Sequence, residues 1–535
     1  MSIFTQPIFY LIVVPLIGSI IILFTNSEEI NWKVIKTPFF TYTINTKISD
    51  YFFYNIALFF SLINLFISIV MWYFFNSNLS EYFKALYFNS IGDNRFKVIP
   101  TYDFSTNFQF IFEINNFSFG VDGISIFFVL LTTFITPIAI FSSYELYTSS
   151  PKDKDPIKIK IFLISLLLLE SLQICAFVSL DLLLFYVFFE SVLPILFILI
   201  IVFGHGEDRD RSAFLLFLYT LAGSLPMLLS ILTIYSYLDS TDFQLISINE
   251  ISLESQKWLW IGFFIALAVK TPLVPFSIWL PKAHGDSPLA GSIILAATIL
   301  KLATYFYLRV LINYLPDASN FFSPIVQTIA VVSIIYASLA TIIQEDTKRL
   351  IAYSSIAHMG VVVLGLFSNT LHGIEGAILL SLAHGWVSPA LFICVGGILY
   401  ERVGTRIVYY MRGLVNLMPI FTIMFFVFTL ANTGIPLSLN FLGEQLALMG
   451  IWEVNPLVAA LGATGILLSA CYSLFLYNRL SYGDYSPYLN SVKDLNRREF
   501  HLLLTLIIPT YFFGIFPNII LNGLHSVIIT LIYSH

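Results

Sequence analysis

Apolar stretches of about 20 residues recur along almost the whole chain, separated by short polar loops. An α-helix of that length spans the hydrocarbon core of a bilayer. Lipid offers no water to backbone N–H and C=O groups, so a crossing segment must pair them internally, as a helix does. With 58% apolar and only 11% charged residues, the chain also lies far from the average soluble protein. We therefore predict an all-α polytopic membrane protein.

The hydropathy pattern predicts about 14 transmembrane helices. The first apolar stretch lacks the basic start and the cleavage site of a signal peptide, so we expect it to remain as a spanning helix. The apolar tail, residues 519–535, is either a last half-span or an interfacial helix. The predicted spans lie near residues 7–24, 55–75, 121–143, 161–180, 182–203, 212–237, 258–280, 290–312, 324–343, 350–368, 373–399, 417–450, 456–478 and 501–518.

Two of these spans contain helix-breaking residues. In the seventh span, Pro272 and Pro275 directly follow Lys270, and in the twelfth, Gly434 and Pro436 interrupt a stretch too long for one straight helix. Lipid tolerates such breaks only where the freed backbone groups face protein or a water-filled cavity. The breaks are five spans apart, and five is odd, so spans 4–8 and 9–13 would form two inverted five-helix repeats, an architecture found in transporters.

The repeats also set the predicted domain boundaries. The N-terminal part holds helices 1 and 2 with long variable loops, and the third helix is followed by a basic loop. The C-terminal part holds the last helix and the apolar tail. In chain order the predicted segments are residues 1–120, 121–160, 161–312 for the first repeat, 313–480 for the second repeat, and 481–535.

Basic residues divide unevenly between the two sets of loops. Of the 26 lysines and arginines, Lys84, Arg95, Lys97 and Lys257 follow even-numbered spans, three lie inside spans, and all the others follow odd-numbered spans. Loops rich in Lys and Arg remain on the cytoplasm-like side of a membrane. We expect the odd-numbered loops on that side and both termini on the other.

A small set of ionisable residues lies well inside the predicted spans, where charge is costly and marks functional sites by default. Lysine and histidine change protonation readily in such surroundings, and a nearby carboxylate modulates them. This mixture predicts a proton relay. The candidate relay residues are Glu190, Lys270, Lys301, His358, His384 and Glu444.

Structural roles compete with the relay at some positions. Glu190 could bond to a helix break, and either histidine could be a satisfied core residue. Glu170 and Glu375 are structural or pathway residues at even odds, and we expect Arg309 to extend toward the headgroups. Two aspartates precede predicted helices and suit ordinary N-caps, namely Asp122 and Asp181.

Other sites are excluded or left without support. Cys175, Cys394 and Cys471 each sit alone in an apolar run, so we expect buried small hydrophobic residues and neither an iron–sulfur cluster nor a disulfide framework. No GxGxxG, Walker loop, HExxH or nucleophile elbow occurs, and no basic block suggests nucleic acid. The chain therefore gives no sign of binding a cofactor or a metal by itself.

Several motifs resemble one known family. They are FGVDGISIFFVLL, FYVFFESVLPILFILI, ALAVKTPLVPFSIWLPKAHGDSP, ILKLATYFYLR, DTKRLIAYSSIAHMG, LAHGWVSPALFICVGGILYERVGTR and NFLGEQLAL. In this order, over roughly residues 118–480, they resemble the antiporter-like membrane subunits of respiratory complex I. The chain 4 paralogues are most similar, because they too carry glutamate in the last broken helix, here Glu444, where chains 2 and 5 tend to have lysine. Residues 25–54 and 77–117 match no part of the family and look like loop extensions.

The resemblance implies roles and a setting. Glu190 and Lys270 would form the regulating ion pair, Lys301 would carry the proton, and His358 and His384 would continue the line to Glu444 on the exit side. The expected location is the inner mitochondrial membrane, with the odd-numbered loops in the matrix and both termini in the intermembrane space. Flavin, iron–sulfur clusters and ubiquinone would belong to other subunits. Partners would be the chain 2 and chain 5 paralogues, accessory subunits and lipids such as cardiolipin.

Two other functions remain open for such a sequence. A stand-alone cation/proton antiporter would share the motifs, and a structural subunit of the membrane arm would share the fold without passing ions.

Overall fold

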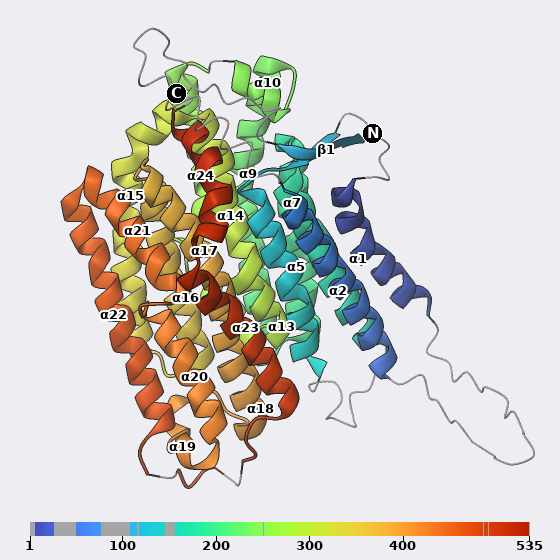
Figure 1. Ribbon diagram of the computed structural model, residues 1–535, viewed down its shortest axis with the longest axis vertical. Coiled ribbons are helices and arrows are strands. Elements are labelled where there is room, and N and C mark those ends of the chain that lie inside the picture. Colours follow the sequence, from blue (N-terminus) through green and yellow to red (C-terminus); the bar gives the residue numbers. More distant parts are fainter. Residues whose placement is uncertain are drawn as a thin grey trace, which may run out of the picture.

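Long helices packed side by side form the body of the protein in the computed structural model (Figure 1). The structure describes residues 6–25, 50–75, 108–114, 117–144, 156–249, 251–484, 486–489 and 492–533. Most of the two predicted loop extensions, 25–54 and 77–117, lies outside these residues. Within them, eleven helices are long and apolar enough to cross a membrane, or twelve if the bent pair at the C-terminus is counted as one span. The prediction of a helical polytopic chain is therefore confirmed.

The first half of the chain holds most of the uninterrupted helices. Aspartates cap some of them as predicted: Asp181 Oδ1 accepts a hydrogen bond from the Leu184 amide at 2.8 Å. In order, the elements are α1 (Pro7–Phe24), α2 (Asp50–Phe74), β1 (Gln109–Ile114), β2 (Phe117–Val121), α5 (Ser125–Ser142), α7 (Pro156–Val178), α8 (Leu182–Phe203), α9 (Arg209–Leu238), α10 (Phe243–Ile248), α11 (Leu253–Lys270) and α12 (Trp279–Asp286).

The second half contains several π-helical segments within longer helices. Such segments are frequent at functional sites. The elements are α13 (Leu289–Ile294), η2 (Leu295–Ile299), α14 (Leu300–Phe306), η3 (Tyr307–Ile312), α15 (Pro316–Ile343), α16 (Thr347–Leu366), α17 (Leu371–Phe392), η4 (Ile393–Leu399), α18 (Tyr400–Val403), η5 (Val408–Tyr410), α19 (Leu414–Leu417), α20 (Pro419–Asn432), α21 (Leu439–Val454), α22 (Pro456–Ser481), α23 (Arg497–Ile515) and α24 (Asn518–Tyr533).

The two predicted helix breaks occur where the prolines indicated. Helix α11 ends at Lys270 and α12 begins at Trp279, while α20 ends at Asn432 and α21 begins at Leu439. At the first break, a side chain of the protein forms a hydrogen bond with a backbone group that the helix no longer pairs. The Ser333 hydroxyl accepts from the Val274 amide at 2.9 Å. This is how a broken helix avoids unpaired backbone in lipid.

The core of the molecule lies around two spans. The hydrophobic windows of Leu289–Ile312 and Leu371–Val403 are completely buried, whereas those of α1 and α2 are 39% and 28% buried. Figure 1 accordingly draws α14, α16 and α17 in the middle, with α1 and α2 along one edge and α22 along the other. The most buried helices are thus those that carry Lys301 and His384.

The expectation of a purely α-helical chain misses one hairpin. Strands β1 and β2 pair antiparallel over Gln109–Val121, at the end of the molecule where α10 also lies (Figure 1). Their alternating aromatic residues suit a half-buried sheet surface, and Phe112 stacks on Phe119 with ring centroids 5.1 Å apart.

The apolar tail forms α24, which continues from α23 after a bend of 65°. It packs on α17, and His525 Nδ1 lies 2.7 Å from Glu375 Oε1. Together the two helices run along much of the height of the molecule (Figure 1). This arrangement favours the first of the two predicted alternatives for the tail, half of a span.

Candidate functional site

Lys301 lies at the centre of the molecule with its side chain fully buried. It sits at the start of α14, directly after the π-helical segment η2. Its Nζ donates to the Ala296 carbonyl at 2.7 Å and lies 2.8 Å from His384 Nδ1 on α17. No carboxylate of the described chain lies within ion-pair distance of this amine. The partner of Lys301 is therefore a titratable ring and not a fixed counterion.

Two histidines continue the contact from Lys301. The rings of His384 and His358, on α17 and α16, have centroids 5.9 Å apart. His358 Nδ1 then lies 3.1 Å from Glu444 Oε1 on α21. Lys301, His384, His358 and Glu444, called here the central line, thus come from four different helices and lie in sequence. Each was a candidate from the sequence alone.

The central line contains buried polar atoms that no described residue satisfies. His358 Nε2 and His384 Nε2 are both buried without a hydrogen-bond partner in the described part of the chain. Buried polar groups of this kind are normally met by protein or by ordered water. The unpaired ring nitrogens therefore suit a path on which protons move through water between side chains.

Glu444, the last residue of the central line, borders a cavity of about 460 Å³ between α21 and α22. Gln445 and Glu453 also line it, and Glu453 lies near the end of α21. Glu444 itself lies ten residues before the end of α21 at Val454, about 15 Å along the helix.

Lys270 and Glu190 lie close together but do not form an ion pair. The Lys270 side chain is 1% exposed, and its Nζ donates to the Phe189 carbonyl at 3.3 Å and lies 3.9 Å from the centre of the Phe189 ring. Among the described residues, no contact within 4.0 Å joins this amine to Glu190. One carboxylate oxygen of Glu190 is buried and unpaired. The pair expected from the family resemblance is therefore open in this structure.

His284 and Lys348 are buried basic residues that were not among the sequence candidates. His284 is completely buried, stacks on Phe392 at 4.6 Å and has no hydrogen-bond partner for either ring nitrogen within the described residues. Lys348 is 1% exposed and its Nζ donates to the Ser287 carbonyl at 2.7 Å. The sequence placed Lys348 in a loop, and the only signal for His284 was its position in the PKAHGDSP motif.

A polar cluster lies next to these residues at the ends of α8 and α12. The Asp286 side chain accepts from the Ser212 hydroxyl, and its carbonyl accepts from the His205 amide at 2.8 Å. Burial and the nearby cations Lys348, Arg406 and Arg209 lower the pKa of His205 from 6.5 to about 4. His205 is therefore neutral at pH 7.

Arg309 contradicts the expectation that it extends to the headgroups. Its side chain is 2% exposed, and its Nη2 donates to Asp122 Oδ2 at 2.6 Å. The guanidinium also lies over the rings of Phe108 and Tyr305. Asp122 still receives the Ser125 amide at 2.8 Å, so it acts as a cap and as a counterion at once. Because the Arg309 guanidinium has a buried carboxylate and two aromatic rings as partners, its charge is stabilised without contact with solvent.

The remaining buried acids lie away from the central line. Glu170 Oε1 accepts from Asn64 Nδ2 at 2.7 Å, between α7 and α2. Of the cysteines, Cys175 and Cys394 are buried as expected, whereas Cys471 is exposed on α22. Within the described residues, no group of three or more His, Cys, Asp or Glu side chains could hold a metal ion.

Comparisons with known proteins point to one family. Residues 179–469 match the family described as NADH:quinone oxidoreductase/Mrp antiporter, TM. NADH-ubiquinone oxidoreductase chain 4 of Mycosarcoma maydis is 55% identical over 92% of this chain and 95% of that relative. The chain 4 protein of Marchantia polymorpha is 47% identical over 80% and 86%, respectively. A chain in the structure of respiratory complex I from Thermus thermophilus with bound NADH shares the fold, with a TM-score of 0.79 and 24% identity over 99% of this chain and 100% of that chain.

Proposed function

Because this chain belongs to the family of NADH-ubiquinone oxidoreductase chain 4, a subunit of respiratory complex I, we propose that it translocates protons in the membrane arm of that enzyme. Reduction of ubiquinone by NADH would occur in other subunits and drive the translocation. Flavin, iron–sulfur clusters and the quinone would bind there, which agrees with the isolated cysteines of this chain.

One observation carries the proposal: four titratable side chains from four helices lie in sequence along the central line, with direct contacts at both ends and two neighbouring histidine rings between them. Lys301 would pass its proton to His384 Nδ1, and the imidazolium would release a proton from Nε2 through ordered water toward His358. His358 would pass it to Glu444. Each step transfers a proton between groups that titrate readily when buried.

Glu190 and Lys270 would control when the line is loaded. A carboxylate that approaches a buried amine favours its protonated form, and one that withdraws favours release. The open arrangement, with the Lys270 amine on the Phe189 carbonyl, corresponds in this proposal to the state in which Lys270 gives up its proton.

The predicted architecture and sidedness extend the proposal. We propose fourteen spans, counting the broken pairs α11–α12 and α20–α21 and the bent pair α23–α24 as one span each. Residues 161–312 and 313–480 would form the two inverted repeats. The odd-numbered loops would face the mitochondrial matrix and both termini the intermembrane space.

We infer the proposed partners from the two faces of the molecule at which candidate site residues lie near the surface. Helix α8 is 39% buried, and the cavity at Glu444 opens between α21 and α22. The chain 2 and chain 5 paralogues would cover these two faces, with accessory subunits and lipids such as cardiolipin around them.

The test is a substitution in the assembled complex. Lys301→Ala should strongly reduce NADH-driven proton pumping in proteoliposomes, with assembly retained, because the line loses its first donor. Lys257→Ala, which changes a lysine near the start of α11 and outside the line, should pump like the wild type. Assembled Lys301→Ala complex that pumps at the wild-type proton-to-electron ratio would support a purely structural subunit. Cation/proton exchange by the isolated chain in liposomes would support a stand-alone antiporter.

A further inference from the structure

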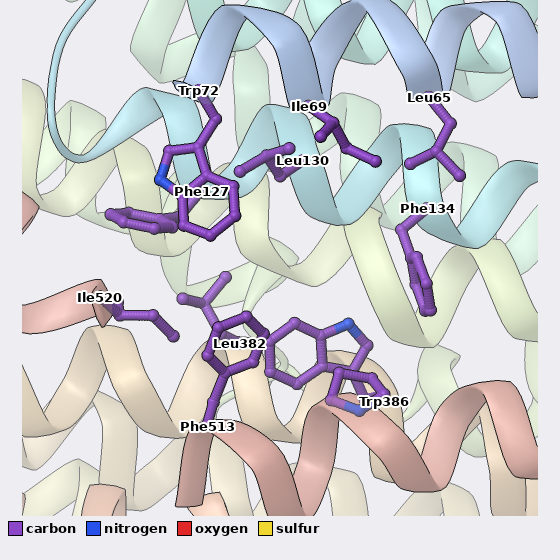
Figure 2. Close-up of a pocket in the computed structure, with 11 residues that line it drawn as sticks. Leu65, Ile69, Trp72, Phe127, Leu130, Phe134, Leu382, Trp386, Phe513 and Ile520 are labelled. Carbon is purple, nitrogen blue, oxygen red and sulfur yellow. The ribbon is translucent and has the colours of Figure 1, made fainter. Parts of the chain in front are cut away.

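An apolar groove of about 190 Å³ lies away from the central line and between two groups of helices. Figure 2 shows Ile69 and Trp72 of α2 and Phe134 of α5 on one side, and Trp386 of α17 and Phe513 of α23 on the other. Almost all of its lining is hydrocarbon or aromatic carbon. A groove of this chemistry takes an apolar ligand and not a water chain.

The depth of the groove matches the inside of a bilayer. Pro509, which lines the groove, is twelve residues from Arg497, and this corresponds to about 18 Å along an α-helix. Half of a typical hydrocarbon core is about 15 Å. The distance from the start of α23 to the groove is therefore about the thickness of one leaflet. At that depth the groove is surrounded by lipid acyl chains.

The start of α23 carries basic residues that suit an anionic headgroup. Lys493 and Arg497 are exposed, and Arg498 lies 5.7 Å from the centre of the Phe141 ring. Three carboxylates lie nearby: Asp494 accepts the amides at the start of α20, Glu499 binds Arg402 at 2.6 Å, and Glu401 lines one hollow together with Arg498. Exposed Lys and Arg at this level attract anionic lipids.

Helices α5 and α23 both line a small hollow beside the basic residues and the groove further along the same helices. Phe141, Arg498 and Leu502 line this hollow. Two turns further along each helix, Phe134 and Pro509 line the groove itself. An acyl chain laid along α5 and α23 from Arg498 would therefore reach the groove.

We propose that this groove binds one acyl chain of an anionic phospholipid whose headgroup lies on Lys493 and Arg497. The lipid fills the space between α2 and α5 on one side and α17, α23 and α24 on the other, and so joins the N-terminal helices to the C-terminal pair.

The first experiment fills the groove. The assembled complex is purified in mild detergent, its retained phospholipids are quantified by mass spectrometry, and a high-resolution map is determined. Wild-type complex should show acyl-chain density in the groove, and Ile69→Trp should remove that density and one retained anionic phospholipid. Leu62→Trp is the matched control, since Leu62 is also exposed on α2 but does not line the groove. An empty groove, a protein side chain or helix in it, a quinone tail, or an unchanged lipid content in Ile69→Trp would each overturn the proposal.

The second experiment tests the headgroup. The double variant Lys493→Gln, Arg497→Gln should lose the same anionic phospholipid, while neutral phospholipids are retained. Arg412→Gln removes an exposed charge from another loop that follows an odd-numbered span and should leave the lipid content unchanged. Equal retention of the anionic lipid in the double variant would show that these residues do not bind it. NADH-driven pumping by the Leu62→Trp control verifies that the complex is intact.

Discussion

The central line and the Glu190–Lys270 pair contain similar residues in different states. In the central line, each residue lies next to the following one, from Lys301 through the two histidines to Glu444. In the pair, the amine of Lys270 instead bonds to a backbone carbonyl and leaves Glu190 without it. Both regions are buried beside a broken or π-helical segment, so burial alone does not explain the difference.

This contrast indicates a division of labour. Side chains that already lie next to one another can pass protons directly or through one water without a large movement. A pair that is separated can instead change the proton affinity of Lys270 by closing. We therefore expect substitutions in the central line to block transfer and substitutions in the pair to alter its control. The predictions below test that difference, from the largest expected effect to the smallest.

Apart from Lys301→Ala, the substitution in the central line that should reduce pumping most is Glu444→Gln. The amide keeps the shape of the side chain but cannot take up the proton from His358, so NADH-driven pumping should fall by roughly tenfold or more. The measurement is the initial pumping rate of assembled complex in proteoliposomes. Glu453→Gln changes a second acid of the same cavity and is the matched control. Wild-type pumping by Glu444→Gln would mean that the line ends elsewhere.

A smaller effect should follow from Glu190→Gln. Because this carboxylate does not contact Lys270 in the open state, its removal should slow pumping by about threefold, equivalent to roughly 0.7 kcal/mol. Maps of the complex at rest and during turnover should also show the Glu190–Lys270 distance changing more than the His358–Glu444 distance. Glu207→Gln, a loop acid just beyond α8, provides the control. If Glu190→Gln impaired pumping as severely as Glu444→Gln, the two regions would not differ as proposed.

The smallest effect concerns His205, which lies beside Asp286 near one end of the molecule. Its pKa is about 4 in the folded chain and 6.5 ordinarily, so the unfolded chain binds more protons between these values. Its contribution to stability is fully present above pH 6.5, falls as the pH drops toward 4, and changes little below that. His205→Gln should therefore flatten the loss of thermal stability of the complex between pH 6.5 and 4. An identical pH dependence in both proteins would contradict this assignment.

The sequence anticipated much of the candidate site but not its contacts. The cost of charge in lipid singled out Lys301, His358, His384 and Glu444, and these do lie together. The same reasoning missed His284, because this histidine lies in a short motif between predicted spans and not inside a long apolar stretch.

Other misses have related causes. Arg309 was expected to extend to the headgroups because its counterion, Asp122, is 187 residues away in the chain. Cys471 was expected to be buried because an apolar run does not reveal which face of a helix meets other helices. The packing of the helices does not fix which end of the molecule faces which side of the membrane, so the sidedness indicated by the basic loops stays a prediction.

The sequence by itself determined which segments are helices in lipid, where two of them break, and which costly charges lie within them. These properties are local, since they depend on the length of an apolar run, the missing amide of proline and the desolvation of a side chain. Only the tertiary structure decided which charges meet. The rotation and packing of helices far apart in sequence placed His384 on Lys301, gave Arg309 a carboxylate, and left Lys270 apart from Glu190. Such contacts depend on how side chains from several helices fill one space, and no single stretch of sequence contains that information.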